Sequence, residues 1–439
     1  MIKLISTGGD TTTVSFPEAM WQGQAPDGGL YVPQSIPALP ESWWSGVADR
    51  TFHEIGAGIA TPWLAPHLNE QEVRTLVEEA LPFDAPLVDV EGTTSVLELF
   101  HGPTLAFKDF GAQFMAKLFG RLGAEDDREL LILVATSGDT GSAVASGFHG
   151  VPGTRVCLLY PSGRVSPLQE KQMTTLGGNV TALEVDGAFD DCQRLVKEAF
   201  RDRELNETFR LSSANSINIA RLLPQSFYYV RAVAQLQERG ERAEPVFVVP
   251  SGNFGNLTAG LLANRMGMPA HRFVAATNRN DVFPNYLETG RFNPKPSVQT
   301  LSNAMDVGNP SNFERIMYLF GGSLERVREQ ILAIGFDDHQ TTEEIRRAHE
   351  EYGYLADPHT AVGLLAARSI REQSLADPSR PLVVLSTAHP AKFRETVEAA
   401  TGAEVEIPER LAQCLSKEKQ TIAAGSRYSD FRNLLNELF

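Results

Sequence analysis

Apolar runs of strand length alternate with helical patterns along most of the chain after Thr94. Nearly continuous apolar strands separated by helices are typical of a parallel sheet that is covered by helices on both faces. We therefore predict an α/β fold with two open, mainly parallel sheets, one in each half of the chain. The predicted strands are 130–136, 156–161, 179–187, 246–250, 272–278 and 381–389.

The segments between these strands predict the helices. One helix is expected to begin at Ser166, because serine is a good N-cap and Pro167 suits the first helical position. Residues 190–200 are amphipathic, and residues 217–236 are predicted to form one long helix with its apolar side on the core. Residues 279–316 are rich in Asn, Pro and Phe and lack a clear period, which predicts a long loop or insertion.

The length of 439 residues leaves room for two or three domains and a large core. The first 95 residues mix proline, glycine and tryptophan and show no clear ligand chemistry, so we predict a small N-terminal subdomain there. A first α/β domain is expected over 96–210 and a second over 211–408. The remaining segment, 409–439, is polar and is predicted to be a helical tail.

The charge balance narrows the range of partners. A formal net charge of −16 and a pI near 5.1 argue against a general surface for nucleic acids or acidic membranes, because phosphates attract lysine and arginine. The three cysteines are far apart and form no CxxC pair, so we expect neither a disulfide framework nor a metal site. The chain starts without an apolar signal core and has no run of membrane-spanning length. These features predict a soluble cytoplasmic protein.

Lys108 is the first candidate for chemistry. It stands between Phe107 and Phe110 and follows Leu105 and Ala106. Apolar surroundings lower the pKa of an amine and favour its neutral, nucleophilic form. Neutral lysine amines form Schiff bases with aldehydes, above all with pyridoxal phosphate. The alternative is a solvated lysine at the start of a helix, with its stem lying on an aromatic ring.

A glycine-rich loop follows the predicted strand 246–250 and leads into a helical pattern. Backbone N–H groups converge in such a loop, and the helix N-terminus adds its dipole, so the loop could hold a phosphate. An ordinary turn between a strand and a helix would favour the same residue types. The loop lacks the Gly-Lys-Ser/Thr ending of a nucleotide triphosphatase, but it complements Lys108 as a phosphate holder beside an aldehyde acceptor. The candidate residues are Gly252, Asn253, Phe254, Gly255 and Asn256.

A second loop, 135–144, also ends an apolar strand and opens a helix, where ligands bind in open α/β sheets. Thr136, Ser137 and Thr140 offer hydroxyl groups, and the loop amides could face an anion such as a carboxylate. Capping of the helix by Ser137, Asp139 or Thr140 explains the same residues equally well.

Two further segments carry polar side chains at predicted element ends. Asn215 and Ser216 precede a helical pattern that contains Arg221, whose planar fork suits phosphate oxygens. On residue types alone, a helix cap and a surface arginine are the favoured interpretation. Thr387 lies near the end of the predicted strand 381–389 and could give a hydroxyl hydrogen bond to a pyridine nitrogen. His389 is expected to be structural. Asp357 is expected to be the N-cap of a helix, and no catalytic role is assigned to His359.

Taken in order, these motifs resemble those of the threonine synthase family, and the resemblance covers most of the chain. It implies a pyridoxal-phosphate enzyme of fold type II, the tryptophan-synthase β-like fold. It further implies conversion of O-phospho-L-homoserine and water into L-threonine and phosphate. The segments that carry the resemblance are 98–116, 135–144, 160–173, 213–225, 249–263, 300–316 and 387–393.

The resemblance also implies roles for single residues. Lys108 would form the Schiff base with the cofactor and move protons, Gly252 to Asn256 would hold the cofactor phosphate, and Thr387 would face the pyridine nitrogen. The substrate carboxylate would be bound by Thr136, Ser137 and Thr140, with Thr140 also within reach of the substrate phosphate. That phosphate would be bound by Asn215, Ser216 and Arg221.

Asp139 departs from the pattern of many fold type II enzymes, which have an asparagine beside the phenolic oxygen of the cofactor. Two anionic oxygens side by side would repel each other. We expect Asp139 to be protonated, to be turned away, or to serve as a cap of the loop.

Two alternatives to threonine synthase remain at this stage. One is another fold type II enzyme, such as a threonine or serine dehydratase, which needs no second phosphate site. The other is a non-catalytic relative that binds a phosphorylated ligand. The resemblance favours a monomer, with a dimer as the alternative.

Overall fold

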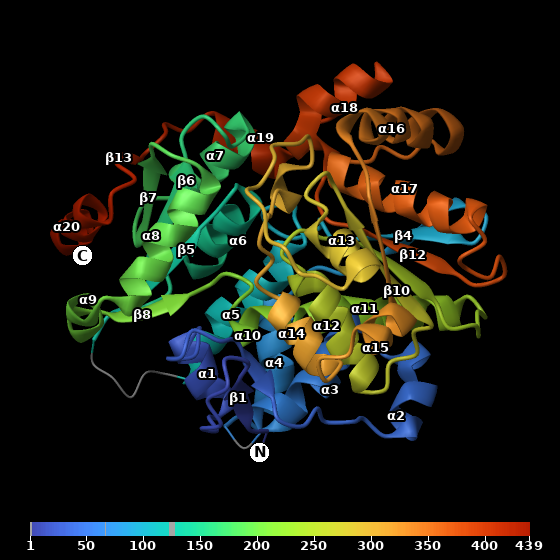
Figure 1. Ribbon diagram of the computed structural model, residues 1–439, viewed down its shortest axis with the longest axis horizontal. Helices are drawn as coiled ribbons and strands as arrows, with labels where there is room; N and C mark the ends of the chain where they lie inside the picture. Colours follow the sequence, from blue (N-terminus) through green and yellow to red (C-terminus); the bar gives the residue numbers. More distant parts are fainter. Residues whose placement is uncertain (1, 66, 123–127) are drawn as a thin grey trace.

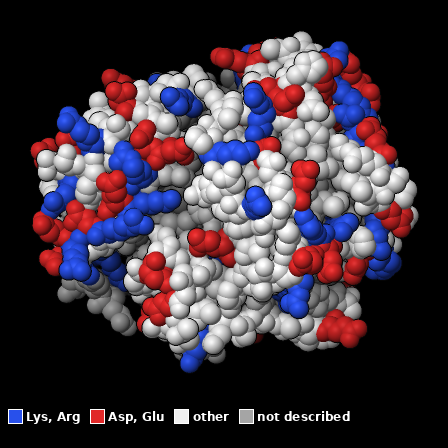
Figure 2. Space-filling model, viewed as in Figure 1, with Lys and Arg blue, Asp and Glu red and all other residues white. Residues whose placement is uncertain are grey.

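The computed structural model describes residues 2–65, 67–122 and 128–439, which form two large sheets and a small N-terminal strand pair (Figure 1). Both large sheets are mainly parallel and are covered by helices, as the apolar strands predicted. Among the described residues, no helix is long and apolar enough to cross a bilayer. Acidic and basic side chains are mixed over the face of the molecule in Figure 2.

The first sheet is wholly parallel and has the strand order β13-β7-β6-β5-β8. Successive residues of β5 face two different cores: Ile132 packs toward Phe148, and Leu133 packs toward Leu195 and Phe431. This two-sided burial explains why β5 is apolar throughout. The strands are β5 (Leu130–Ala135), β6 (Thr154–Pro161), β7 (Val180–Val185), β8 (Arg210–Ser213) and β13 (Ile422–Ala424). Their helices are α6 (Asp139–Phe148), α7 (Pro167–Thr174), α8 (Phe189–Arg201), α9 (Arg203–Thr208), α19 (Glu409–Leu415) and α20 (Tyr428–Leu438).

The second sheet has the order β11-β10-β9-β12-β4-β3, and its edge strand β3 is antiparallel to β4. One face packs against α17, and the other packs against α11 and α12. The strands are β3 (Leu87–Glu91), β4 (Thr94–Glu98), β9 (Val246–Pro250), β10 (Arg272–Thr277), β11 (Ile331–Gly335) and β12 (Leu382–Ser386). The helices in this half of the chain include α11 (Gln225–Glu238), α12 (Gly255–Arg265), α13 (Val282–Thr289), α14 (Phe313–Leu319), α15 (Leu324–Gln330), α16 (Asp338–Tyr352), α17 (Pro358–Glu372) and α18 (Arg394–Thr401).

The N-terminal elements lie below the two sheets in Figure 1 and share their main core. Strands β1 (Leu4–Ser6) and β2 (Tyr31–Pro33) form an antiparallel pair. Their helices are α1 (Phe16–Gln22), α2 (Glu41–Ser45), α3 (Phe52–Leu64) and α4 (Glu70–Ala80). The division of the chain into domains stays a prediction.

Two predictions about elements are wrong. Residues 217–236 do not form one helix, because Pro224 lacks an N–H group and separates α10 (Ile219–Leu222) from α11. The predicted loop 279–316 contains α13, a short 3-10 helix at Asn303–Met305 and the start of α14. The C-terminal segment is helical as expected, but it also supplies β13 to the first sheet.

Candidate active site

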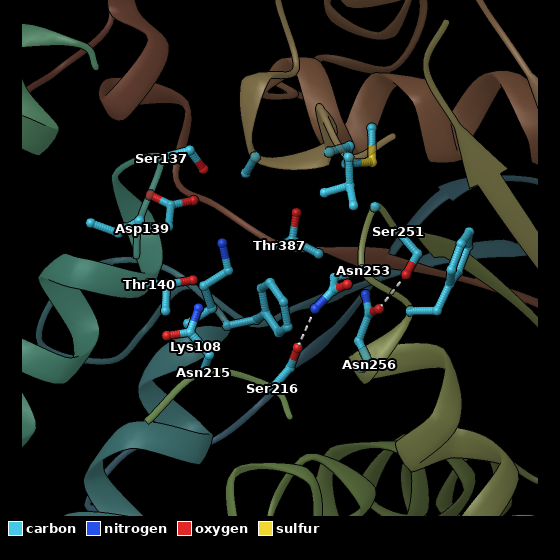
Figure 3. A pocket seen from close by; sticks show the side chains of 18 of the residues that line it. Lys108, Ser137, Asp139, Thr140, Asn215, Ser216, Ser251, Asn253, Asn256 and Thr387 are labelled. Atoms are coloured by element: carbon cyan, nitrogen blue, oxygen red, sulfur yellow. Dashed lines mark hydrogen bonds between the residues drawn. The ribbon is translucent and has the colours of Figure 1, made fainter. Parts of the chain in front are cut away.

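One cavity lies where the carboxyl ends of β5, β9 and β12 meet the start of α5 (Lys108–Leu122) (Figure 3). It is lined by every residue that the sequence singled out for the site. These residues are Lys108, Thr136, Ser137, Asp139, Thr140, Asn215, Ser216, Arg221, Gly252, Asn253, Phe254, Gly255, Asn256 and Thr387.

The backbone before Lys108 is tied to the end of β12. The N–H of Phe107 donates to the carbonyl of Thr387 at 2.9 Å, and the N–H of His389 donates to the carbonyl of Leu105 at 3.1 Å. Leu105 has a φ of 59°, in the left-handed region that residues with side chains rarely adopt. This strained turn brings Lys108 and Thr387, which are far apart in the sequence, into one cavity.

Lys108 has the electrostatic environment of a nucleophile. Burial lowers the pKa of its amine to about 8, and the cations of Lys392 and Arg221 act in the same direction, whereas Asp139 opposes them. The amine lies 5.7 Å from the ring centroid of Phe107. A solvated lysine at a helix start, the alternative, would keep a pKa near its usual value of about 10.4.

The loop between β9 and α12 is built to bind an anion with its backbone. Phe254 adopts a φ of 57°, and a Cβ atom on Gly252 would lie 2.6 Å from the Cα of Met305. The five successive N–H groups from Gly252 to Asn256 have no acceptor among the described residues. They precede or open a helix of 11 residues, whose dipole favours an anion. This arrangement fits the phosphate of pyridoxal phosphate.

The side chains of this loop brace it. The Asn256 Oδ1 accepts hydrogen bonds from the Ser251 hydroxyl at 2.6 Å and from the Leu257 N–H at 3.0 Å. The Asn253 side chain donates to the Ser216 hydroxyl at 2.7 Å and accepts from the Ser311 N–H at 2.6 Å. The asparagine amides therefore fix the shape of the loop and leave the backbone N–H groups for the ligand.

The loop after β5 is held by Thr136, whose hydroxyl accepts hydrogen bonds from the N–H groups of Gly138 and Gly141 at 3.0 and 2.8 Å. Gly138, with a φ of 132°, occupies the N-cap position of α6. Ser137 and Thr140 line the cavity, and neither side chain makes a hydrogen bond within the described residues. Capping therefore does not explain these two hydroxyl groups, and they are available to a ligand.

Arg221 is buried beside a second group of polar side chains, so the interpretation as a surface arginine is wrong. It is 2% exposed, and burial lowers the pKa of its guanidinium to about 10. Its Nη1 donates to the carbonyl of Ala214 at 2.5 Å, but its Nε has no partner. The nearby Asn215 Oδ1 is also buried without a partner. Unpartnered buried polar atoms are rare, and a bound ligand, ion or water is one way in which their missing hydrogen bonds are supplied.

Asp139 is ionised and paired with a lysine to which the sequence gave no role. The Lys392 Nζ lies 2.6 Å from the Asp139 Oδ1, and the Gln169 Nε2 donates to the same oxygen at 2.8 Å. Burial alone would raise the pKa of Asp139, but Lys392 and Lys108 outweigh it and hold the pKa well below its usual range. The side chain of Asp139 is therefore not protonated, and it does not cap the helix α6.

Several lining residues were not predicted. Residues 304–307 cover the glycine loop, and Phe189 and Gln193 of α8 border the cavity. His359, to which the sequence gave no catalytic role, also lines the cavity: it contacts Asp357 at 2.6 Å, and its Nε2 accepts from the Ala304 N–H at 3.2 Å. The sequence places Lys392 beside Pro390, Ala391 and Phe393, but it does not show which carboxylate the amine meets.

The chain is similar to known proteins over nearly its whole length. The model of the pyridoxal-phosphate dependent enzymes matches residues 83–387, and the models of the threonine synthase N terminus and C-terminal part match 3–81 and 360–432. The threonine synthase of Escherichia coli (strain K12) is 44% identical over 412 residues, 94% of each chain. The chain belongs to the threonine synthase family.

Solved structures agree with this membership. The crystal structure of threonine synthase from Escherichia coli matches with a TM-score of 0.92 and 42% identity over 99% of both chains. Pyridoxal-phosphate-bound threonine synthase from Brucella melitensis matches with a TM-score of 0.91 and 35% identity, over 100% of this chain and 99% of that one. A diaminopropionate ammonia lyase from Escherichia coli, 17% identical with a TM-score of 0.58, shares the fold alone. This member of the threonine synthase family is a pyridoxal-phosphate-dependent enzyme of fold type II.

Proposed function

We propose that the enzyme converts O-phospho-L-homoserine and water into L-threonine and inorganic phosphate. The observation that carries the proposal is a second anion site beside the cofactor site. The buried Arg221 guanidinium, whose Nε has no partner among the described residues, lines the same cavity as the free N–H groups of the glycine loop. One site suits the cofactor phosphate and the other suits a phosphorylated substrate.

The cofactor would be held at three points. The N–H groups from Gly252 to Asn256 would bind its phosphate, Lys108 would bind its aldehyde carbon, and the Thr387 hydroxyl would face its ring nitrogen. No hydrogen bond within the described residues engages that hydroxyl, although Thr387 is only 6% exposed. When bound, pyridoxal phosphate withdraws electrons from the amino acid attached to it, which makes the Cα–H and Cβ–H bonds acidic.

The substrate would lie between the two loops of the first sheet and the glycine loop. Ser137 and Thr140, supported by the hydrogen bonds of Thr136, would bind the α-carboxylate. Arg221, Asn215 and Ser216 would bind the phosphate that leaves Cγ, and a water molecule would supply the hydroxyl group of Cβ.

Lys108 is the proton carrier that this cavity offers. Its amine, with a pKa of about 8, can take up and return a proton near neutral pH. Asp139 is committed to Lys392, and both ring nitrogens of His359 are engaged by Asp357 and Ala304.

The alternatives are less well supported. A threonine or serine dehydratase has no use for a buried arginine at a second anion site. A non-catalytic relative would have no use for a lysine with a lowered pKa beside that site. The family membership stated above also favours the synthase.

The test is to add O-phospho-L-homoserine to the enzyme with pyridoxal phosphate and to follow phosphate and threonine together. We expect both products in equal amounts, and neither from a Lys108→Ala variant. Conversion of serine or threonine to a keto acid, with no reaction of the phosphorylated substrate, would replace the synthase by a dehydratase. A protein that binds the substrate without turnover would support the non-catalytic alternative.

The monomeric state and the cytoplasmic location stay predictions. Light scattering coupled to gel filtration would test the first: a mass near 48.1 kDa is expected for a monomer, and twice that mass for a dimer.

A further inference from the structure

The Asp139–Lys392 pair stands at the cofactor site and has no role in the reaction as described above. We propose that Lys392 is a positioning residue that takes up the charge of Asp139 and thereby leaves the amine of Lys108 free to be neutral. The inference concerns the charge of Lys108 in the cofactor site and does not depend on which substrate is bound. It is therefore tested separately from the proposed reaction.

The pair is held firmly from both ends. Lys392 is 2% exposed and Asp139 is likewise 2% exposed, and their contact is 2.6 Å long. The Lys392 Nζ also donates to the carbonyl of Thr104 at 3.0 Å, in the turn that precedes Lys108. On the other side, Gln169 donates to the Asp139 Oδ1 at 2.8 Å. Lys392 thus joins the loop of Asp139 to the loop of Lys108.

Two ammonium groups, those of Lys392 and Lys108, act on Asp139. Among the described residues only the Lys392 ammonium contacts it directly. Lys392 and Lys108 both lower the pKa of Asp139, and the direct contact is with Lys392. Lys392 and Gln169 both contact the Oδ1 atom, and the Oδ2 atom has no hydrogen bond from the described residues. If Lys392 were absent, Lys108 would be the remaining cation for this carboxylate. A carboxylate that pairs with Lys108 would hold its amine in the protonated, unreactive form.

The other charged groups near Lys108 do not replace this arrangement. Arg221 of α10 is a cation and lowers the pKa of Lys108. Asp109 of α5 is bound by the N–H and hydroxyl groups of Thr104 at 2.8 and 2.7 Å, and burial raises its pKa to about 6. His359 of α17 contacts Asp357. Asp139 is therefore the carboxylate that sets the charge of Lys108, and Lys392 is its counter-ion.

The experiment measures the titration of Lys108 in the full chain after its cofactor has been removed. Competitive labelling with acetic anhydride over a pH series, read by mass spectrometry of peptides, reports the protonation of each lysine. In the wild type we expect half-maximal labelling of Lys108 at about pH 8. In K392M the midpoint should rise by at least about one pH unit, which means roughly tenfold less labelling at low pH. K392R keeps the charge and should stay near the wild type.

The double variant D139N/K392M separates positioning from a direct effect of the Lys392 charge. With both charges removed, burial still disfavours the ammonium form of Lys108, so the midpoint should return to near pH 8. A double variant with the raised midpoint of K392M would overturn the proposal, and so would a folded K392M with an unchanged midpoint.

Two further variants complete the design. If K392M does not fold, the D139N variant tests the proposal instead. Without the Asp139 carboxylate, Lys392 lies unpaired near Lys108, so the labelling midpoint of Lys108 should fall. An unchanged midpoint would contradict the proposal. K419M is the matched control, because Lys419 forms ion pairs with Glu170 and Glu184 at 2.6 and 2.7 Å outside the cavity. Its substitution should leave the titration of Lys108 at the wild-type midpoint.

Discussion

Arg221 is held in place before any ligand arrives. Its guanidinium donates to the carbonyl oxygens of Ala214 and Lys108, at 2.5 and 3.4 Å, while the Nε remains without a partner. Burial strengthens its attraction for an anion, because little water is present to screen the charge. A buried guanidinium of this kind attracts a dianionic phosphate more strongly than it attracts a group with a single negative charge.

Replacement of Arg221 by alanine should raise the KM for O-phospho-L-homoserine by roughly tenfold to a hundredfold, since charged hydrogen bonds stabilise by about 1.5–3 kcal/mol. Affinity for pyridoxal phosphate should change far less. Steady-state kinetics and a titration with the cofactor measure the two effects. R231A is the control, because Arg231 forms its ion pair with Asp84 outside the cavity. Unchanged kinetics in R221A would remove this residue from the site.

Cofactor uptake should depend on the protonation of Lys108. A folded-state pKa of about 8 lies below the usual value of about 10.4, so the neutral amine gains population as pH rises through 8. The rate at which the cofactor-free chain takes up pyridoxal phosphate should therefore increase with pH and level off above this value. Stopped-flow absorbance measures this rate. Nα-acetyllysine, whose side-chain amine is solvated, serves as the reference. A midpoint as high as that of Nα-acetyllysine would contradict the buried environment assigned to Lys108.

Residue identities in the cavity were largely predictable, because most of the predicted residues belong to short motifs that directly follow a strand. Lys392 was missed for a physical reason. Its partner Asp139 lies in a different segment of the chain, and the sequence alone does not show that the two meet. The same limit applied to Arg221, whose burial depends on packing around α10.

The loop that we assign to the cofactor phosphate depends on close backbone contact. Gly252 lies under residues 304–307, where a Cβ atom would come within 2.6 Å of the Met305 Cα and 3.0 Å of its carbonyl carbon and oxygen. Backbone atoms cannot move aside as a flexible side chain can. The absence of a side chain at this position therefore keeps the loop and its cover together.

Gly252→Ala should displace this cover and weaken binding of pyridoxal phosphate at least about tenfold, because overpacking costs about 1–3 kcal/mol. Fluorescence titration with the cofactor measures the loss. The control is G120A in α5, where nothing lies within 4 Å of the added Cβ atom. That variant should keep its cofactor affinity and gain up to about 1 kcal/mol in stability, since alanine favours a helix. Equal affinities of the two variants would contradict the role of Gly252.

At the scale of elements, periodicity predicted the apolar strands well and the helix boundaries less well. Pro224 was visible in the sequence, yet the apolar pattern on both sides of it suggested one continuous helix. In the structure α10 ends before this proline and α11 begins directly after it. The helix α13 escaped prediction because it is short and lies in a segment rich in asparagine and proline.

At the scale of the whole molecule, Arg315 of α14 joins three parts of the chain. It is 1% exposed, and its donors reach the carbonyl oxygens of Tyr31, Ser216 and Ile217 and the Asn312 side chain. Burial lowers the pKa of this guanidinium to about 9. The N-terminal subdomain is thereby linked to the segment that we assign to the substrate phosphate.

Arg315→Met should lower the free energy of unfolding by on the order of 3 kcal/mol, because several buried acceptors lose their donors. It should also raise the KM for the phosphorylated substrate, since Ser216 loses support. Urea unfolding and steady-state kinetics measure both changes. R326M, at a residue of α15 near the surface, should leave both values near the wild type. A fully stable R315M would show that the N-terminal part is held by its apolar core alone.

The sequence did not show which sheet the strands β3, β4 and β13 would join. The hairpin of β3 and β4 precedes Lys108 but pairs with β12, and β13 from the C-terminal segment pairs with β7. Local patterns indicate that a strand forms, but its neighbour is decided by packing between distant segments. The six predicted strands lie in the sheet of their own half of the chain, but β3, β4, β11 and β13 were not predicted.

The backbone contacts between the turn before Lys108 and residues 387–389 also bear on how the enzyme is made. A ribosome synthesises the chain from its N-terminus, so the lysine emerges long before Thr387 and His389. The complete cofactor site cannot assemble until those residues have left the exit tunnel. The cofactor can therefore stabilise the finished protein by binding it, but it cannot guide the folding of residues 1–386 during translation.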